Sequence, residues 1–278
     1  AYAVFPSYNP NSYKSAKEVS VKNWTLTDVN LGVMTASSVK IDATGSTFKK
    51  DSTLSSSGLI RVTSGQTANN VTINGGTWDA SGCQSAFRFY PNMSNLTISN
   101  ATIKNASDAG IYLSATKGVT LDTVEITASG SYGVNFSSCS DITIKGCTIT
   151  SNKNTNVILQ TTSGTANISD TNLSSSTGGY GIYVQECDAK LTNCTVDNNY
   201  FNGISCTGKA TESFFSVLDK YINSGSAEQL NLAIGNSIAD ALIGHSGSEG
   251  FALNLRDIGA NDYYFESDSE NNYFCIDF

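Results

Sequence analysis

Charged side chains are scarce in this chain of 278 residues. Aspartate, glutamate, lysine and arginine make up 14% of it, the formal net charge is −8, and the arginines are Arg61, Arg88 and Arg256. Proteins that bind nucleic acids carry a basic patch or stripe that neutralises phosphates, and this sequence has none. We therefore expect no nucleic-acid partner, and a polyanionic ligand would have to meet local positive groups.

Long apolar runs are also missing. A helix that spans a membrane needs about 20 consecutive apolar residues, and no stretch of the sequence approaches that length. We therefore expect no membrane span. The chain is instead rich in serine, threonine, asparagine and glycine and contains 13 tyrosines, a composition typical of extracellular proteins. Its opening, AYAVFPSYNP, fits a chain from which a signal peptide has been removed, so we expect a secreted or cell-surface protein.

Two short phrases return along the middle of the chain at a nearly constant interval. The first is an apolar pair, a short step and another apolar pair: NLTISNATIK from Asn95, VTLDTVEIT from Val119, DITIKGCTIT from Asp141, TANISDTNLS from Thr165 and AKLTNCTVD from Ala189. The second fills the gaps: AFRF from Ala86, GIYL from Gly110, GVNF from Gly133, NVIL from Asn156, GIYV from Gly181 and GISC from Gly203. A fixed period of about 22–25 residues is typical of a stacked solenoid.

Alternation within each phrase predicts which side chains point inward, because successive residues of a strand face opposite sides. Three short strands per turn, each aligned with its counterparts in the neighbouring turns, describe an all-β fold, the parallel β-helix, with about eight coils. In the first strand of the regular coils the inward pairs are Val71/Ile73, Leu96/Ile98, Val119/Leu121, Ile142/Ile144, Ala166/Ile168 and Ala189/Leu191.

Small and polar residues mark the corners of the predicted coils. Glycine precedes the third strand in four coils: Gly110, Gly133, Gly181 and Gly203. At this place we expect a positive φ or a tight corner. Asn100 and Asn193 recur at the bend after the first strand and are predicted to stack as an amide ladder. Asn-x-Ser/Thr triplets are numerous, and we interpret their asparagines as turn and ladder residues: Asn23, Asn70, Asn95, Asn100, Asn105, Asn135, Asn167 and Asn193.

The seven cysteines favour buried thiols over disulfides. Cys147, Cys194 and Cys206 occupy inward positions, where a thiol acts as a small apolar side chain. Cys139 and Cys187 share a turn position, but two coils separate them by about 10 Å, which is beyond the reach of a disulfide.

The repeat pattern ends near residue 210. We predict a β-helix over residues 1–210, with residues 1–17 as a lead-in or cap, and a small α/β capping segment over residues 211–278. The last segment combines two amphipathic helical patterns, ESFFSVLDKYI and SAEQLNLAIGNSIADALIG, with two strand-like ones, FALNL and YFCIDF. Because the end of a solenoid exposes an apolar cross-section, a cap is the expected role, and a partner-binding subdomain is the alternative.

The segment that runs from NVTINGGTWDASG through AFRFYPNMSNLTISNATIKNASDAGIYL to KGVTLDTVEITASGSYGVNF carries a family resemblance. It resembles the pectin-lyase-like superfamily of right-handed parallel β-helices, especially bacterial secreted proteins related to the polygalacturonase-type glycoside hydrolases. The resemblance covers roughly residues 60–210 and implies a right-handed solenoid. It does not imply one activity, because such repeats occur in hydrolases, lyases, epimerases, tailspikes and adhesins.

The catalytic phrases of the polygalacturonase-type hydrolases are replaced in this chain. Those enzymes carry Asn-Thr-Asp-Gly-Ile-Asp, then Gly-Asp-Asp on the next coil, then Gly-His-Gly, and two carboxylates must flank the glycosidic oxygen. The corresponding acidic and histidine positions hold Ala109, Tyr112, Ser131, Tyr132 and Thr155. Asp108 is one residue out of place, and the single histidine, His245, lies outside the repeats. We therefore expect no catalytic residues of this type.

A lyase of the pectate type would need several carboxylates for Ca²⁺ on one outer sheet and an arginine or lysine base. The acidic residues of the repeats sit at differing offsets in their coils: Asp122, Glu125, Asp141, Asp170 and Asp197. We therefore expect no metal ion and no other cofactor.

The outward residues of the third strand offer a different kind of site. The candidate substrate-binding residues lie on this strand or beside it: Arg88, Tyr90, Asp108, Tyr112, Tyr132, Asn135, Tyr180 and Tyr183. Aromatic rings stack on the C–H faces of sugars, while amide and guanidinium groups bond to hydroxyls or a carboxylate. The same strand carries the catalytic face in the resembling hydrolases. The alternative is that tyrosine decorates an exposed sheet because of its strand propensity.

The leading interpretation is an extracellular β-helix protein that binds a polysaccharide or cell-surface glycan and has no catalytic activity. A second is a polysaccharide lyase, hydrolase or epimerase with a nonstandard arrangement around Arg88, Asp108 and Tyr112. A third is a structural adhesin. A rival surface, able to order water as ice-binding proteins do, is the threonine row of the first strand: Thr72, Thr97, Thr120 and Thr143.

Overall fold

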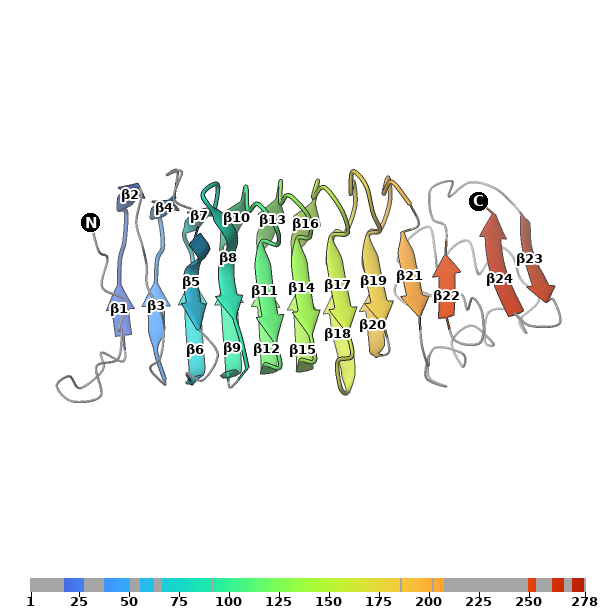
Figure 1. Cartoon of the computed structure of the whole chain (residues 1–278), viewed down its shortest axis with the longest axis horizontal. Helices are drawn as coiled ribbons and strands as arrows, with labels where there is room; N and C mark the ends of the chain where they lie inside the picture. Colours follow the sequence, from blue (N-terminus) through green and yellow to red (C-terminus); the bar gives the residue numbers. More distant parts are fainter. Residues whose placement is uncertain are drawn as a thin grey trace.

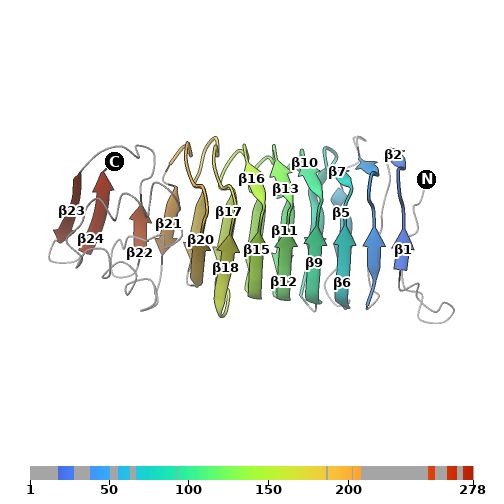
Figure 2. The ribbon, with the colours of Figure 1, turned by 180° about the vertical axis from the view of Figure 1, so that it is seen from behind.

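The computed structural model describes residues 18–27, 38–50, 56–62, 67–91, 93–185, 187–201, 203–207, 250–253, 262–267 and 272–277. Every regular element in these ranges is a strand, and the strands stack side by side along one long axis (Figure 1; Figure 2 shows the opposite side). The predicted all-β parallel solenoid is thus confirmed. Within the same ranges, no helix has the length and apolar character that crossing a membrane requires.

Three parallel sheets run along the solenoid. The first contains β1 (Glu18–Ser20), β3 (Lys40–Asp42), β6 (Ala68–Asn74), β9 (Met93–Ser99), β12 (Lys117–Asp122), β15 (Ser140–Lys145), β18 (Thr165–Ser169) and β20 (Asp188–Thr192). The second contains β2 (Thr25–Thr27), β4 (Thr47–Lys49), β7 (Thr77–Asp79), β10 (Thr102–Lys104), β13 (Glu125–Thr127) and β16 (Thr148–Thr150). The third contains β5 (Ser56–Val62), β8 (Cys83–Phe89), β11 (Ile111–Ser114), β14 (Val134–Ser137), β17 (Val157–Gln160), β19 (Ile182–Gln185) and β21 (Ile204–Thr207).

The strand-like patterns of the C-terminal third are also strands. β22 (Gly250–Leu253) pairs antiparallel with β21 of the third sheet, and β23 (Asp262–Ser267) pairs antiparallel with β24 (Asn272–Asp277). The two predicted helices, and therefore the boundary proposed near residue 210, lie outside the described residues. The sequence predicted about eight coils. The first sheet contains eight strands, and the described chain completes about seven turns.

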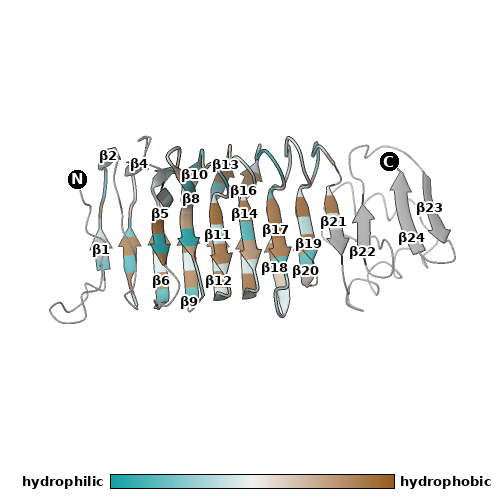
Figure 3. Ribbon diagram, in the orientation of Figure 1, coloured by the Kyte–Doolittle hydropathy of each residue, from teal (hydrophilic) through white to brown (hydrophobic). Residues whose placement is uncertain are grey.

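The inward residues form one continuous apolar core. Leu96, Val119 and Ile142 are directly paired across neighbouring strands, as the alternation predicted, and each is at most 1% exposed. Aromatic side chains fill the core where the early coils stack: the rings of Phe48 and Trp78 lie 4.2 Å apart and nearly parallel. Along the strands, apolar and polar positions alternate in bands (Figure 3). Burial of each large apolar side chain contributes about 1.5–3 kcal/mol, so the stacked rows hold the coils together.

The bend between the first and second sheets is built from left-handed residues. In the five coils from β9 onward, one residue per coil has a φ between 52° and 60° there: Asn100, Thr123, Gly146, Asp170 and Asn193. The amides of Asn100 and Asn193 do bond along the stack, but their acceptors are Asn74 Oδ1 at 2.8 Å and Asp170 Oδ1 at 2.7 Å rather than a continuous row of asparagines. Among the Asn-x-Ser/Thr asparagines, the turn role is confirmed where a positive φ falls between strands: Asn23, Asn100, Asn105 and Asn193. Asn70 and Asn95 instead have a positive φ within β6 and β9, and their amides bond to each other.

The glycines before the third sheet have a different cause. We expected either a positive φ or a tight corner at these positions. Gly110, Gly133 and Gly181 do not have a positive φ, so the tight corner is the alternative that holds. A Cβ atom on Gly133 would lie 2.4 Å from Ile149 Cγ2 and 2.6 Å from the carbonyl oxygen of Asn156. Close approach of the neighbouring coil therefore excludes any side chain.

Where asparagine replaces this glycine, a buried amide network forms. Asn156 is fully buried and accepts a hydrogen bond from Asn152 Nδ2 at 2.9 Å. Its own Nδ2 donates to the carbonyl of Ser174 at 2.8 Å and to Asn199 Oδ1 at 3.3 Å. The amides thus satisfy one another inside the solenoid, as buried polar groups must.

The inward cysteines behave as predicted. Cys147 and Cys194 are buried, and the Cys147 thiol donates to the carbonyl of Lys145 at 3.2 Å. Burial raises the pKa of the Cys147 thiol to about 11, which keeps it protonated and unreactive at neutral pH. The side chain of Cys206 lies outside the described part of the chain.

Candidate functional site

The predicted site residues lie on or beside one outward row of the third sheet. The strand register aligns the members of this row in consecutive coils, and four of them, Arg88, Tyr112, Asn135 and Tyr183, are predicted site residues. The full row is Arg61, Arg88, Tyr112, Asn135, Ile158, Tyr183 and Ser205. Alternation along the strands keeps this row outside, since flanking residues such as Ile111 and Leu113 are fully buried. Tyr112 and Tyr183 are three strands apart, or about 14 Å at ~4.8 Å per strand. The sheet therefore supports a continuous row of outward side chains along the solenoid.

Arg88 and three other predicted residues form a cluster. Its Nε donates to Tyr90 Oη at 3.0 Å, and its Nη1 lies 3.5 Å from Asp108 Oδ2. Its Cζ is 4.2 Å from the centre of the Tyr112 ring and 5.5 Å from that of Tyr90, both within the range of a cation–π contact. The two tyrosine rings are 5.9 Å apart and inclined at 54°. The cluster is therefore two aromatic rings held by one guanidinium.

A second aromatic cluster lies toward the C-terminal end of the same face. The rings of Tyr180 and Tyr183 are 5.7 Å apart and inclined at 21°, and Phe201 lies 5.6 Å from Tyr180. Tyr200 packs edge-on against Phe201 at 4.8 Å. Tyr200 and Phe201 are 57% and 48% exposed, which is high for large aromatic side chains. Tyr200 and Phe201 were not among the predicted site residues, although their position as an aromatic pair shortly before Gly203 was a usable signal.

Two residues lie between the clusters. Ile158 lies in the outward row and is nevertheless only 6% exposed. The Oδ1 atom of Asn135 is buried and has no hydrogen-bond partner among the described residues. Tyr132 is half-buried in the corner before β14, and its carbonyl accepts a hydrogen bond from the amide of Gly110. The structure thus brings the eight predicted residues to one face but divides them between two clusters and a covered centre.

The positions that correspond to hydrolase carboxylates hold no acid. Ala109 is fully buried, and Tyr112 is stacked on Arg88. Asp108 is the one carboxylate among the outward residues named above, and it already contacts the guanidinium of Arg88. Among the residues that the structure describes, no three His, Cys, Asp or Glu side chains are close enough to hold a metal ion.

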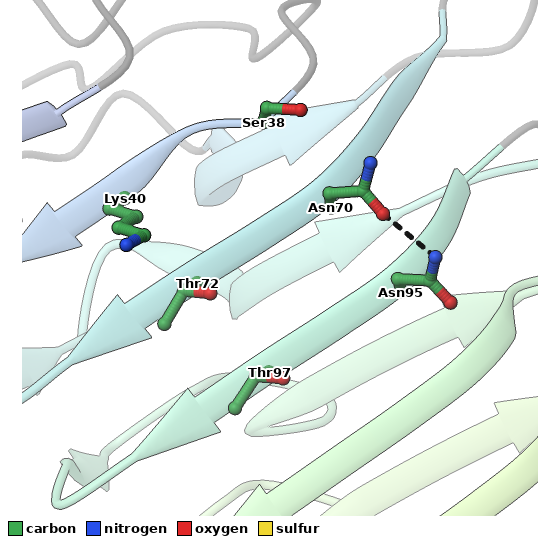
Figure 4. Close-up of a pocket in the computed structure, with 6 residues that line it drawn as sticks. All are labelled: Ser38, Lys40, Asn70, Thr72, Asn95 and Thr97. Carbon is green, nitrogen blue, oxygen red and sulfur yellow. Dashed lines mark hydrogen bonds between the residues drawn. The ribbon is translucent and has the colours of Figure 1, made fainter.

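A separate shallow groove of about 270 Å³ lies on the outer face of the first sheet (Figure 4). Hydroxyl, amide and ammonium groups from three successive coils line it: Ser38, Lys40, Asn70, Thr72, Asn95 and Thr97. Asn95 Nδ2 donates to Asn70 Oδ1 at 2.7 Å, and both asparagines are left-handed, with φ of 55° and 53°. Thr72 and Thr97 are neighbours in the predicted threonine row, but Lys40 begins that row and Asn167 and Lys190 end it. The row is therefore not the uniform hydroxyl surface that ordering water would need.

Three stacked parallel sheets around one apolar core define the class of this protein as a parallel β-solenoid. The family model described as "Right handed beta helix region" matches residues 11–157 and 59–216, so the chain belongs to the right-handed β-helix family. Searches of curated proteins and of solved structures found no match.

Proposed function

We propose that this protein binds a polysaccharide or cell-surface glycan on the outer face of its third sheet, outside the cell, and without catalytic activity. The observation that supports this most is the presence of two aromatic clusters on one outward row, around Tyr112 and around Tyr183. The extracellular location is supported by the polar, weakly charged composition.

The side chains of the two aromatic clusters are of the kinds that bind sugar rings. A pyranose presents a C–H face that packs on an aromatic ring and hydroxyls that need hydrogen-bond partners. On this face, Tyr90 and Tyr112 supply rings toward one end, and Tyr183 and Phe201 supply rings toward the other. Rings at both ends of one row suit a linear glycan that lies along the solenoid axis.

The proposed lack of catalytic activity follows from the surroundings of Asp108. Hydrolysis by paired carboxylates requires one acid and one base on opposite sides of the glycosidic oxygen. Asp108 is paired with Arg88, and the neighbouring positions of the same corner hold Ser131 and Asn154. This arrangement supports a binding role more than a lyase or hydrolase with a nonstandard site.

Glycan-array binding and calorimetry with the wild type and the double variant Tyr112→Ala/Tyr183→Ala test the proposal. Truncation of both rings removes the stacking surface, so we expect binding to fall by at least about tenfold. Trp24→Ala is the matched control, because Trp24 is 56% exposed and lies on another part of the coil. Unchanged binding by the double variant would rule out this face as the site. Release of reducing ends or unsaturated sugars from pectin, alginate or xylan would instead show an enzyme.

A further inference from the structure

The guanidinium of Arg88 is covered and its charge is compensated. The side chain is 12% exposed. Its Nε donates to Tyr90 Oη, its Nη1 lies 3.4 Å from Ser85 Oγ and 3.5 Å from Asp108 Oδ2, and the Tyr112 ring lies 4.2 Å from Cζ. A free arginine would offer five donors in a planar fork to a carboxylate or sulfate. Here that fork is already directed at groups of the protein.

An acidic sugar would have to displace part of this arrangement in order to reach Arg88. The candidates for displacement are the carboxylate of Asp108, which is 41% exposed, and the ring of Tyr112. Either displacement gives up an interaction that the free protein already makes, so little binding free energy remains for the new ion pair. The acidic chain, with a formal net charge of −8, also repels a polyanion at long range.

The same contacts of Arg88 hold the rings of Tyr90 and Tyr112 in place. Arg88 lies against one face of Tyr112 and bonds the hydroxyl of Tyr90, so it fixes both rings at their mutual inclination of 54°. Tyr112 is only partly buried, so part of its ring remains for a ligand. A ring held in place before binding loses less conformational entropy when a ligand stacks on it.

We infer that Arg88 is a positioning residue for Tyr90 and Tyr112, and that the ligand of this face is an uncharged polysaccharide rather than an acidic one. The inference rests on the proposed function, since it names the class of glycan that the same face takes. Arg61 provides an internal control. It is the neighbour of Arg88 in the outward row, carries the same charge, and its Nη1 contacts Ser57 Oγ at 3.2 Å.

The experiment compares neutral oligosaccharides (cello-, xylo- and manno-hexaose) with oligogalacturonate of similar length. Binding to the wild type, Arg88→Met, Arg88→Lys and Arg61→Met is measured by calorimetry at low and high salt. We expect a neutral oligosaccharide to bind the wild type with less than about twofold salt dependence, because no ion pair forms with the ligand. Arg88→Met is expected to weaken that binding by about tenfold, Arg88→Lys by less, and Arg61→Met not measurably.

A spectroscopic readout separates positioning from a general loss of structure. We expect Arg88→Met to change the near-ultraviolet circular dichroism of the tyrosines, with partial recovery in Arg88→Lys, while the fluorescence of the buried Trp78 stays native. Tighter, salt-sensitive binding of oligogalacturonate, or equal losses in Arg61→Met and Arg88→Met, would overturn the inference and leave glycan binding intact. Loss of binding in the tyrosine double variant with none in Arg88→Met would also overturn it. Failure of the wild type to bind any glycan would remove the proposed function and this inference together.

Discussion

Two corners of the same coil use small and polar residues for opposite reasons. From β9 onward, the bend between the first and second sheets takes one left-handed residue per coil, and asparagine, threonine, glycine and aspartate all occupy it, with φ between 52° and 60°. The corner before the third sheet takes Gly110, Gly133 and Gly181, none of which has a positive φ.

The difference separates a backbone requirement from a packing requirement. At the left-handed bend the side chains point to solvent, and Asn100, Thr123, Gly146 and Asn193 are all exposed. Any residue that tolerates the left-handed region is therefore accepted there. At the glycine corner the next coil lies against the Cα atom, and space rather than φ decides the residue. Substitutions at the two corners should therefore differ in how much they lower the free energy of unfolding and in the cause of that loss.

Gly133→Ala is expected to have the largest effect. The new Cβ would lie 2.4 Å from Ile149 Cγ2 and 2.6 Å from the carbonyl oxygen of Asn156. That carbonyl accepts the amide of Val134 in the ladder between coils and cannot move without breaking it. We expect the free energy of unfolding to fall by about 3 kcal/mol or more, measured by urea denaturation with Trp78 fluorescence as the probe.

Gly146→Ala is the matched control for that variant. Gly146 has a φ of +60°, but the nearest atom to an added Cβ is Thr123 Oγ1 at 3.5 Å, an ordinary contact. The cost is then the left-handed conformation alone, about 1–2 kcal/mol. Equal losses in the two variants would mean that the corners do not differ as we describe.

Asn156→Gly tests the one described coil in which an amide occupies the glycine corner. The variant restores the residue of the neighbouring coils but removes the partner of Asn152 Nδ2 and the donor to the carbonyl of Ser174. Both of those groups belong to buried residues, so we expect a loss of about 2–3 kcal/mol in the same denaturation assay. Asn167→Ala, at an exposed strand position, should change stability by less than about 0.5 kcal/mol. If Asn156→Gly is as stable as the wild type, the buried amide network does not stabilise the fold.

The alternation of apolar residues was enough to predict the solenoid. Strand register follows from which residues must be inside, because a shift by one position would turn every core side chain outward. The row from Arg88 through Tyr112 and Asn135 to Tyr183 was predicted for this reason and is confirmed by the strand pairing. Handedness came from the family resemblance instead, since alternation alone is the same for either hand.

The contacts within the site could not be predicted in the same way. Alternation fixes the face on which Arg88 lies, but side-chain rotamers decide whether its guanidinium is offered to solvent or packed against Tyr112. The low exposure of Ile158 does not follow from alternation either, since alternation places this residue in the outward row. The role of the corner glycines was ambiguous because a positive φ and a close approach select the same residue.

Asn100→Ala should have a smaller effect than any change at the glycine corner. Asn100 has a φ of 52° and donates to Asn74 Oδ1 at 2.8 Å, and alanine keeps neither the tolerance for this conformation nor the bond. We expect a loss of about 1 kcal/mol at this exposed bend, measured by the urea midpoint. Asn100→Gly should be nearly neutral, because glycine adopts the left-handed region without strain. A glycine variant as unstable as the alanine one would show that the amide bond, not the backbone, sets the preference.

Asp79 gives the smallest expected effect and extends the comparison to pH. It ends β7 and accepts hydrogen bonds from Ser81 and from the left-handed Asn105 of the next coil, at 3.0 Å for the Asn105 amide. Burial alone would raise the pKa of this carboxyl, but the hydrogen bonds and the charge of Lys104 outweigh it, and the pKa of Asp79 is lowered.

A lowered pKa in the folded state fixes the sign of the pH effect. The ionised carboxylate stabilises the fold above its unfolded pKa of about 3.9, and this contribution is lost as the pH falls through the lower folded value. Because other carboxylates titrate in the same range, the measurement is the difference in melting temperature between the wild type and Asp79→Asn. We expect that difference to be largest near neutral pH and to shrink below about pH 4, where the wild-type carboxyl also becomes neutral. A difference that stays constant down to pH 2 would show that the charge of Asp79 does not stabilise this corner, and that its bonds to Ser81 and Asn105 act as neutral ones.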